Sequence, residues 1–171
     1  MKVVCDSSVI IGLSVVGKLD ILWRLFEDVY VPEAVFYEVC VKGKNRVGSR
    51  ELQDAVKCGC IKVKKPSNTL LVNSLVDPLG KGEAETIVLA LEISADYACI
   101  DERIARRKAK QLGIKIKGTI GILWSAMKKN LISIKEFKEC LSKLEDFGFR
   151  FPKRIIKRYL EEFEKKLEDN Y

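Results

Sequence analysis

The regular alternation of short strand-like runs with helical patterns is the feature that most constrains the fold of this chain. Five runs are typical of strands: "KVVC" at 2–5, "VYV" at 29–31, "CIKVKK" at 60–65, "YACI" at 97–100 and "IKIK" at 114–117. Segments with apolar residues at helical spacing lie between them. Because parallel strands need crossover connections, this order predicts a mainly parallel sheet of the α/β class, with helices on both faces.

Length and composition predict one compact unit. With 171 residues, 47% of them hydrophobic, the chain is long enough for a single well-buried core and carries no repeats. We expect the main domain to span residues 1–150. The segment 151–171, with a proline at the start of its helical pattern and many charges, is expected to form a C-terminal helix that packs on or extends from the same domain.

Several classes of protein are excluded or made less favourable. Asp6, Ser7 and Ser8 interrupt the apolar amino terminus, and no run of about 18 apolar residues follows, so we expect a soluble, cytoplasmic protein without a membrane segment. The six cysteines lack CxxC spacing and there is no histidine, which argues against a zinc site. A net charge of +7 favours a polyanionic partner, although a solvated Lys- and Glu-rich surface gives the same count.

Four acidic residues from separate segments are candidates for a metal site. Asp6 and Asp101 directly follow strand-like runs, and the carboxyl ends of parallel strands share one edge of the sheet. Glu38 and Glu83 lie on helices that could reach the same edge, and several carboxylates together suit Mg²⁺ or Mn²⁺. Each acid also has a structural interpretation: Asp6 and Asp101 as helix N-caps, Glu83 as a first-turn acid, and Glu38 as a solvated residue. The pattern alone leaves both interpretations open.

The segment that follows Asp101 is expected to form a helix with two distinct faces. Its apolar stripe comprises Ile104, Ala105, Ala109 and Leu112. Another side carries cationic residues at i, i+3, i+4 and i+7, which are Arg103, Arg106, Arg107 and Lys110. Such a face beside an acidic site suits binding of a nucleic-acid backbone. An ordinary solvated helix face explains it equally well.

The order and spacing of these acids resemble the PIN-domain nucleases, specifically the VapC-like branch of archaeal and bacterial proteins. The matching segments are "VVCDSSVIIGLSVVGKLDIL", "VYVPEAVFYEV", "LGKGEAETIVLALEISADYACIDERIARRKAKQLGIKIKGTIGILWSAMKKNLI" and the closing "FGFRFP". They cover most of positions 1–152. The resemblance implies a three-layer α/β/α sandwich and an acidic pocket that binds Mg²⁺ or Mn²⁺ for RNA cleavage.

Carried over by position, the family's catalytic and metal-binding acids fall on Asp6, Glu38 and Asp101. The third acid of the family pattern, an aspartate, falls on Glu83, whose spacing to Asp101 fits better than that of Glu85. Two residues apart on a helix, Glu83 and Glu85 point in nearly opposite directions, so both cannot face one ion. The resemblance places four residues in supporting roles, which are Ser7, Glu85, Glu102 and Thr119.

The leading hypothesis is therefore a metal-dependent endoribonuclease that hydrolyses phosphodiester bonds. RNA is the expected substrate, and the chain is expected to act either as the toxin of a toxin–antitoxin pair, with an antitoxin protein as partner, or in RNA maturation or decay. A homodimer is also expected. The alternative is a PIN-fold module that binds RNA or protein and has little or no catalytic activity. Phosphatases of the haloacid-dehalogenase type need a second Asp where this chain has Ser8, so that class is disfavoured.

Overall fold

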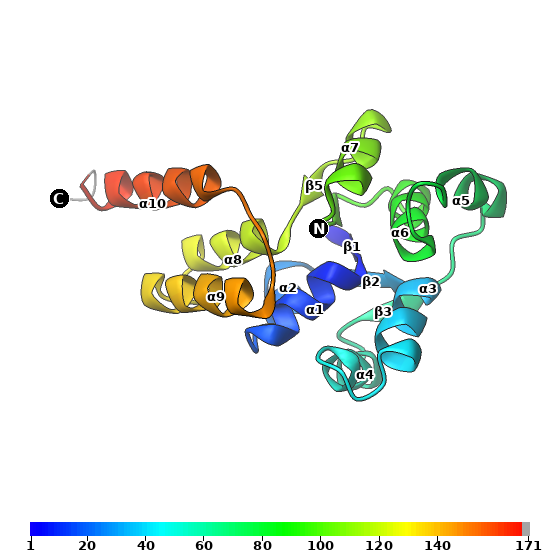
Figure 1. Ribbon diagram of the computed structural model, residues 1–171, viewed down its shortest axis with the longest axis horizontal. Coiled ribbons are helices and arrows are strands. Elements are labelled where there is room, and N and C mark those ends of the chain that lie inside the picture. Colours follow the sequence, from blue (N-terminus) through cyan, green and yellow to red (C-terminus); the bar gives the residue numbers. More distant parts are fainter. Residues whose placement is uncertain (169–171) are drawn as a thin grey trace.

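The computed structural model describes residues 1–168, and within them the chain builds a parallel sheet flanked by helices (Figure 1). The strands are β1 (Lys2–Cys5), β2 (Asp28–Pro32), β3 (Lys62–Lys64), β4 (Tyr97–Cys99) and β5 (Ile116–Lys117). The end of the predicted C-terminal helix, residues 169–171, lies outside the described residues.

The helices connect the strands in the predicted alternation. They are α1 (Ser7–Val15), α2 (Ile21–Leu25), α3 (Glu33–Phe36), the π-helical segment η1 (Tyr37–Lys42), α4 (Ser49–Lys57), α5 (Thr69–Leu75), α6 (Lys81–Glu92), α7 (Arg103–Gln111), α8 (Thr119–Lys128), α9 (Ile134–Phe147) and α10 (Lys153–Glu168). No helix in the described part of the chain is both long enough and apolar enough to cross a membrane.

Successive side chains of the strands pack into two separate hydrophobic cores on opposite faces of the sheet. Val3 and Cys5 of β1 join a core with α1, α2, α4, α8 and α9, whereas Val4 joins a second core with α5, α6 and α7. This division follows from the pleat, because neighbouring residues of a strand point to opposite faces of the sheet. The predicted three-layer α/β/α sandwich with a parallel sheet is confirmed.

The order of the strands across the sheet is β3-β2-β1-β4-β5, with every neighbouring pair parallel. From β1 the chain adds β2 and β3 on one side and then crosses to place β4 and β5 on the other. β1 and β4 therefore flank the point where the direction of winding reverses. In open α/β sheets, ligands bind in the crevice at the carboxyl ends of such a pair of strands.

Two expectations about α7 and its neighbour need correction. The predicted apolar stripe is narrower than expected: Ala105 and Ala109 are fully buried, but Ile104 and Leu112 are 46% and 37% exposed. The reason is that α7 covers the edge strand β5, so protein packs against only one side of this helix. The strand expected over 114–117 is limited to Ile116–Lys117.

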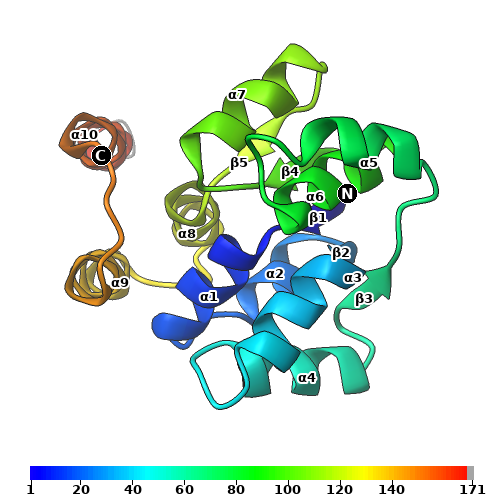
Figure 2. The ribbon, with the colours of Figure 1, turned by 45° about the vertical axis from the view of Figure 1, so that its right-hand side comes forward.

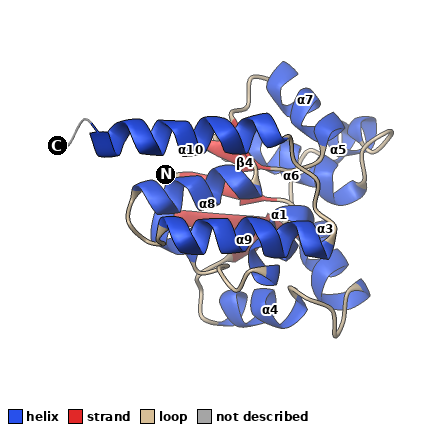
Figure 3. Cartoon of the chain, turned by 60° about the vertical axis from the view of Figure 1, so that its left-hand side comes forward, coloured by secondary structure: helices blue, strands red, loops and turns tan. Residues whose placement is uncertain are grey.

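The last helices lie together on one side of the sheet. Figures 2 and 3 show α8, α9 and α10 next to one another. The indole of Trp124 in α8 stacks on Tyr159 of α10 with ring centroids 4.7 Å apart, and Ile156 and Leu160 pack on the first core. The expected domain boundary near residue 150 stays a prediction.

Candidate active site

The site begins at the carboxyl ends of β1 and β4. Cys5 and Cys99 are paired in the parallel ladder, and the backbone N–H of Asp6 donates to the carbonyl of Cys99 at 2.9 Å. Asp101 lies two residues beyond Cys99 on the neighbouring strand end. The two aspartates therefore lie at neighbouring strand ends beside the topological switch point, as their positions after strands predicted, although neither is among the groups that shift the pKa of the other.

The carboxylate of Asp6 is almost completely buried and is held at both oxygens. It caps α1 by accepting from the backbone N–H of Ser7 at 2.7 Å, and its second oxygen accepts from the hydroxyl of Ser8 at 3.0 Å. Burial raises the pKa of Asp6 to about 6, and the negative charges of Glu83 and Glu38 add to the rise against these hydrogen bonds. Asp6 is thus both an N-cap and one of several acids that repel one another.

Glu38 reaches the first turn of α6 from the π-helical segment η1. Its carboxylate accepts from the backbone N–H of Gly82 at 3.2 Å. A Cβ at Gly82 would lie 2.7 Å from Oε2 of Glu38, so a larger residue there would displace the Glu38 carboxylate from this position. π-Helical turns often occur at functional sites, because the extra residue redirects a side chain.

Glu83 and Glu85 play different parts. Glu83 accepts from the backbone N–H of Gly80 at 3.1 Å and is half-buried. Burial raises its pKa, and the charges of Glu102 and Glu38 raise it further. Glu85 is buried on another side of α6, where its carboxylate accepts from the backbone N–H of Ala34 at the start of α3 at 3.0 Å. Glu83 therefore faces the other acids, and Glu85 ties α6 to α3.

Asp101 is held by the start of α8. The backbone N–H and the hydroxyl of Thr119 donate to its two oxygens at 2.8 and 2.6 Å. Burial raises the pKa of Asp101, opposed by these hydrogen bonds and by the positive charge of Arg106. Gly118 leaves room for both side chains, because a Cβ there would lie 2.6 Å from Oδ1 of Asp101 and 2.7 Å from Nη1 of Arg106.

The N-cap of α7 is Glu102. The structural interpretation of Asp101 as the N-cap of this helix is therefore wrong. The carboxylate of Glu102 accepts from the backbone N–H groups of Ile104 and Ala105 at 2.6 and 2.9 Å. Asp101 is one residue too early for that role, which leaves it free to bind Thr119. Glu102 still contributes negative charge to the crevice, since it raises the pKa of Glu83.

The donor set fits a hard divalent cation in chemistry. Three carboxylates, from Asp6, Glu38 and Glu83, interact unfavourably across the crevice, and no Lys or Arg is among the groups that shift the pKa of Asp6 or Glu83. A cation would relieve that repulsion. As the described side chains lie, however, no three Asp, Glu or Cys residues stand close enough together to hold an ion. The site has the ligands and the charge for a cation, and its carboxylates would have to draw closer around it.

The cationic residues of α7 border this crevice. All four predicted residues, Arg103, Arg106, Arg107 and Lys110, line a cavity that begins at Asp101. Arg106 turns inward, donating to the backbone carbonyl of Ile100 at 3.0 Å. The other three are exposed or nearly so and have no such contact with the strand end. The same helix therefore stabilises the Asp101 end of the site and presents positive charge to solvent.

Sequence reasoning missed several residues of the site. Ser8 was noticed only as an interruption, although a hydroxyl two residues after a strand-end Asp is well placed to bind it. Gly82 and Gly118 had no sequence signal beyond lying near helix starts, because their role depends on distant side chains: Glu38 of η1 for Gly82, and Asp101 and Arg106 for Gly118. Cationic residues outside α7 line the same cavity, and these are Lys117, Lys128, Arg150 and Arg158.

Comparison with known proteins agrees with this geometry. A family model described as a PIN domain matches residues 2–165. PIN domains are usually nucleases and generally use divalent metals. Comparisons with curated proteins and with solved structures gave no match. The family match spans nearly the whole chain and includes every acid of the crevice, so the chain belongs to the PIN-domain family.

Proposed function

We propose that this protein is a divalent-metal-dependent endoribonuclease that hydrolyses phosphodiester bonds in RNA. The observation that carries the proposal is the placement of Asp6 and Asp101 at the carboxyl ends of β1 and β4, with the carboxylate of Glu38 bound to the first turn of α6, which also carries Glu83. Repulsion among the carboxylates of Asp6, Glu38 and Glu83 adds to the effect of burial in raising the pKa of Asp6 and of Glu83. A folded protein gains nothing in stability from such repulsion. A bound ligand that carries positive charge would offset it.

The four predicted acids would hold Mg²⁺ or Mn²⁺, with Asp101 completing the set. When bound, the cation would polarise a phosphate and lower the pKa of water for attack on phosphorus. The protein's own contribution is to fix the ligands: Ser7 and Ser8 orient Asp6, Gly82 orients Glu38, and Thr119 orients Asp101. Such outer hydrogen bonds typically change metal affinity or activity by about 10- to 100-fold.

A nucleic acid is the substrate class supported by the surroundings of the crevice. The cationic residues of α7 line a cavity that starts at Asp101, so a phosphate backbone bound there would pass beside the acids. The chain has no histidine, so proton transfer would depend on carboxylates and water.

Incubation of the purified protein with Mn²⁺ and either single-stranded or structured RNA tests the proposal. We expect cleavage that stops on chelation and is lost in Asp6→Asn and Asp101→Asn. The control Asp146→Asn removes an exposed carboxylate of α9 and should leave cleavage unchanged. Cleavage that persists in both crevice variants would overturn the assignment of the site.

The second candidate is a PIN-fold module that binds RNA or protein without turnover. One observation favours it: the described acids do not stand close enough together to hold an ion as they lie. RNA binding by the wild type, without cleavage in Mg²⁺ or Mn²⁺, would support this candidate over the nuclease.

A role as the toxin of a toxin–antitoxin pair, with an antitoxin protein as partner, stays a prediction from the family resemblance, as does the homodimer. The cytoplasmic location stays a prediction from the composition of the amino terminus. Light scattering on the purified chain measures its mass in solution and tests the homodimer directly. Co-purification with the product of a neighbouring short gene would test the antitoxin.

A further inference from the structure

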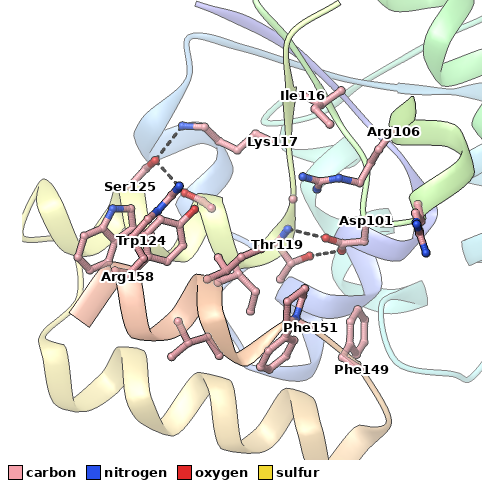
Figure 4. Close-up of a pocket in the computed structure, with 18 of the residues that line it drawn as sticks. Asp101, Arg106, Ile116, Lys117, Thr119, Trp124, Ser125, Phe149, Phe151 and Arg158 are labelled. Atoms are coloured by element: carbon pink, nitrogen blue, oxygen red, sulfur yellow. Dashed lines mark hydrogen bonds between the residues drawn. The ribbon is translucent and has the colours of Figure 1, made fainter. Parts of the chain in front are cut away.

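A cavity of about 890 Å³ is lined by residues of α7, α8 and α10, and of the four predicted acids only Asp101 lines it (Figure 4). Asp101 lies at one end of it. One wall is the cationic side of α7, described above. The opposite wall comes from the segment between α9 and α10 and from α10 itself, about 50 residues later in the chain, and no role in the site has been assigned to it.

The opposite wall is also cationic. Arg150 precedes α10 and Arg158 lies on α10, and both line the cavity. Lys128 at the end of α8 adds a further positive charge to the lining between the two walls. Acidic residues among the lining are limited to Asp101 and Glu162 within the described part of the chain. Positive charge on two facing walls, with a carboxylate at the crevice end, favours an extended polyanion over a single small anion.

Aromatic rings lie at the crevice end of the same wall. Figure 4 shows Phe149 and Phe151 close to Thr119 and Asp101. Both are half-buried, so each keeps part of its ring accessible. Gly12 of α1 leaves room for the ring of Phe149, because a Cβ there would lie 3.1 Å from Cζ of Phe149 and 3.0 Å from Oγ1 of Thr119. Accessible rings beside cationic residues are the combination on which single-stranded nucleic acids bind, because bases stack on the rings.

The other aromatic residues of the cavity have a different part. Trp124 is buried and stacks on Tyr159 with their planes 9° apart. This pair fixes α10 against α8 and so holds Arg158 at the far end of the cavity, near Trp124 and Ser125 in Figure 4. The wall is therefore anchored, and its cationic side chains project from a fixed helix.

We propose that the C-terminal segment from Phe149 to Arg158 forms the second wall of an RNA-binding channel, which holds the strand next to the acidic crevice. Bases adjoining the crevice stack on Phe149 and Phe151, and the backbone lies between α7 and the side chains of Arg150 and Arg158. The cavity volume lies within the range of about 300–1,000 Å³ that is typical of ligand pockets, which is enough for a short stretch of single strand. This inference rests on the proposed function, because it assigns the substrate channel of that same site.

Two neighbouring residues of α10 offer a matched comparison. Arg158 lines the channel, whereas Lys157 lies on the groove between α9 and α10, close to Glu161 at 3.7 Å. Arg158→Ala and Lys157→Ala each remove one positive charge at nearly the same place in the chain. The two substitutions differ in the side of α10 from which the charge is removed.

Fluorescence anisotropy with a labelled single strand of about eight uridines, in EDTA, measures binding without cleavage. Arg158→Ala should weaken binding by about three- to tenfold and lower the slope of log affinity against log salt by about 0.7. Lys157→Ala should change the affinity by less than about twofold. Equal effects of the two substitutions, or no binding by the wild type, would overturn the proposal.

The aromatic contact is tested with Phe151→Leu, which keeps an apolar side chain against the core and removes the ring. It should weaken binding of the uridine strand at least about fivefold. It should leave binding of an abasic strand of equal length unchanged, which loss of folding would not. An equal loss on both strands would contradict stacking. The binding assay contains no divalent metal, so its result does not depend on cleavage. Failure of the channel proposal and failure of the proposed nuclease function can therefore be told apart.

Discussion

The acidic crevice and the cationic channel meet at Asp101 and are built in opposite ways. In the crevice, short carboxylate side chains are fixed by backbone N–H groups and hydroxyls, and burial raises the pKa of Asp6 and of Asp101. In the channel, long Lys and Arg side chains extend from helices and are mostly exposed. Short carboxylate side chains suit a small cation, around which they would draw closer, and exposed flexible cations suit the backbone of a polymer.

The largest expected effect is on the free energy of unfolding, to which the acids of the crevice contribute. The pKa of Asp6 is about 6 in the folded protein, whereas the ordinary value for an aspartate is 3.8. The ionised form of Asp6 therefore destabilises the fold. Because folding raises the pKa of Asp6, the stability that this residue contributes is present at low pH and is lost as the pH rises through about 6. Without divalent cations, Asp6→Asn should therefore raise the free energy of unfolding by about 3 kcal/mol near pH 8.

Urea unfolding of the wild type and Asp6→Asn measures this gain across pH. It should shrink toward zero as the pH falls to about 4. Removal of one exposed charge from the channel, as in Arg103→Ala, should change the free energy of unfolding by less than about 0.5 kcal/mol. If Asp6→Asn proves less stable than the wild type near pH 8, the repulsion in the crevice is not as described.

The next effect separates the two glutamates of α6. Glu83→Gln should lower the rate of Mn²⁺-dependent RNA cleavage by about a hundredfold or more, since outer-sphere partners alone account for about 10- to 100-fold. Glu85→Gln keeps an oxygen acceptor for the N–H of Ala34 and should cleave nearly as the wild type. Its expected effect is a loss of about 1 kcal/mol in the free energy of unfolding. If Glu85→Gln lost cleavage and Glu83→Gln retained it, Glu85 and not Glu83 would be the third metal ligand.

Thr119→Val removes the hydroxyl donor to Asp101 and keeps the shape of a buried side chain. We expect the Mn²⁺ concentration for half-maximal cleavage to rise by about 10- to 100-fold, because Asp101 is then held by one donor. Thr119→Ser retains the hydroxyl and serves as the control. Similar behaviour of the two variants would show that the hydroxyl does not position Asp101.

The smallest effect belongs to the exposed cations of α7. Arg107→Ala and Lys110→Ala should each weaken RNA binding a few-fold, and each should lower the slope of log affinity against log salt by about 0.7. Binding titrations over a range of salt concentrations measure both quantities. Unchanged slopes would place the RNA away from α7.

Much of the fold could be predicted from local patterns, whereas the site could be predicted only in part. Strand-like runs and helical periodicity identified the alternation of elements, since each depends on residues close in sequence. The hydrogen bonds that hold Asp101 to Thr119 and the exposure of Ile104 depend on neighbours that local patterns do not reveal. The second wall of the channel is the clearest case, because Arg158 reaches the site only through the packing of α10 on α8.

Binding of Mn²⁺ to the RNA-free protein, followed by calorimetry and by the thermal unfolding midpoint, tests the central claim most directly. We predict that the wild type and Glu85→Gln bind the ion, and that their unfolding midpoint rises with Mn²⁺ concentration because the ion binds only the folded state. Asp6→Asn and Glu83→Gln should show little heat and no such rise. Equal binding by all four proteins, or no binding by the wild type at millimolar Mn²⁺, would contradict the assignment of the acidic crevice as a metal site.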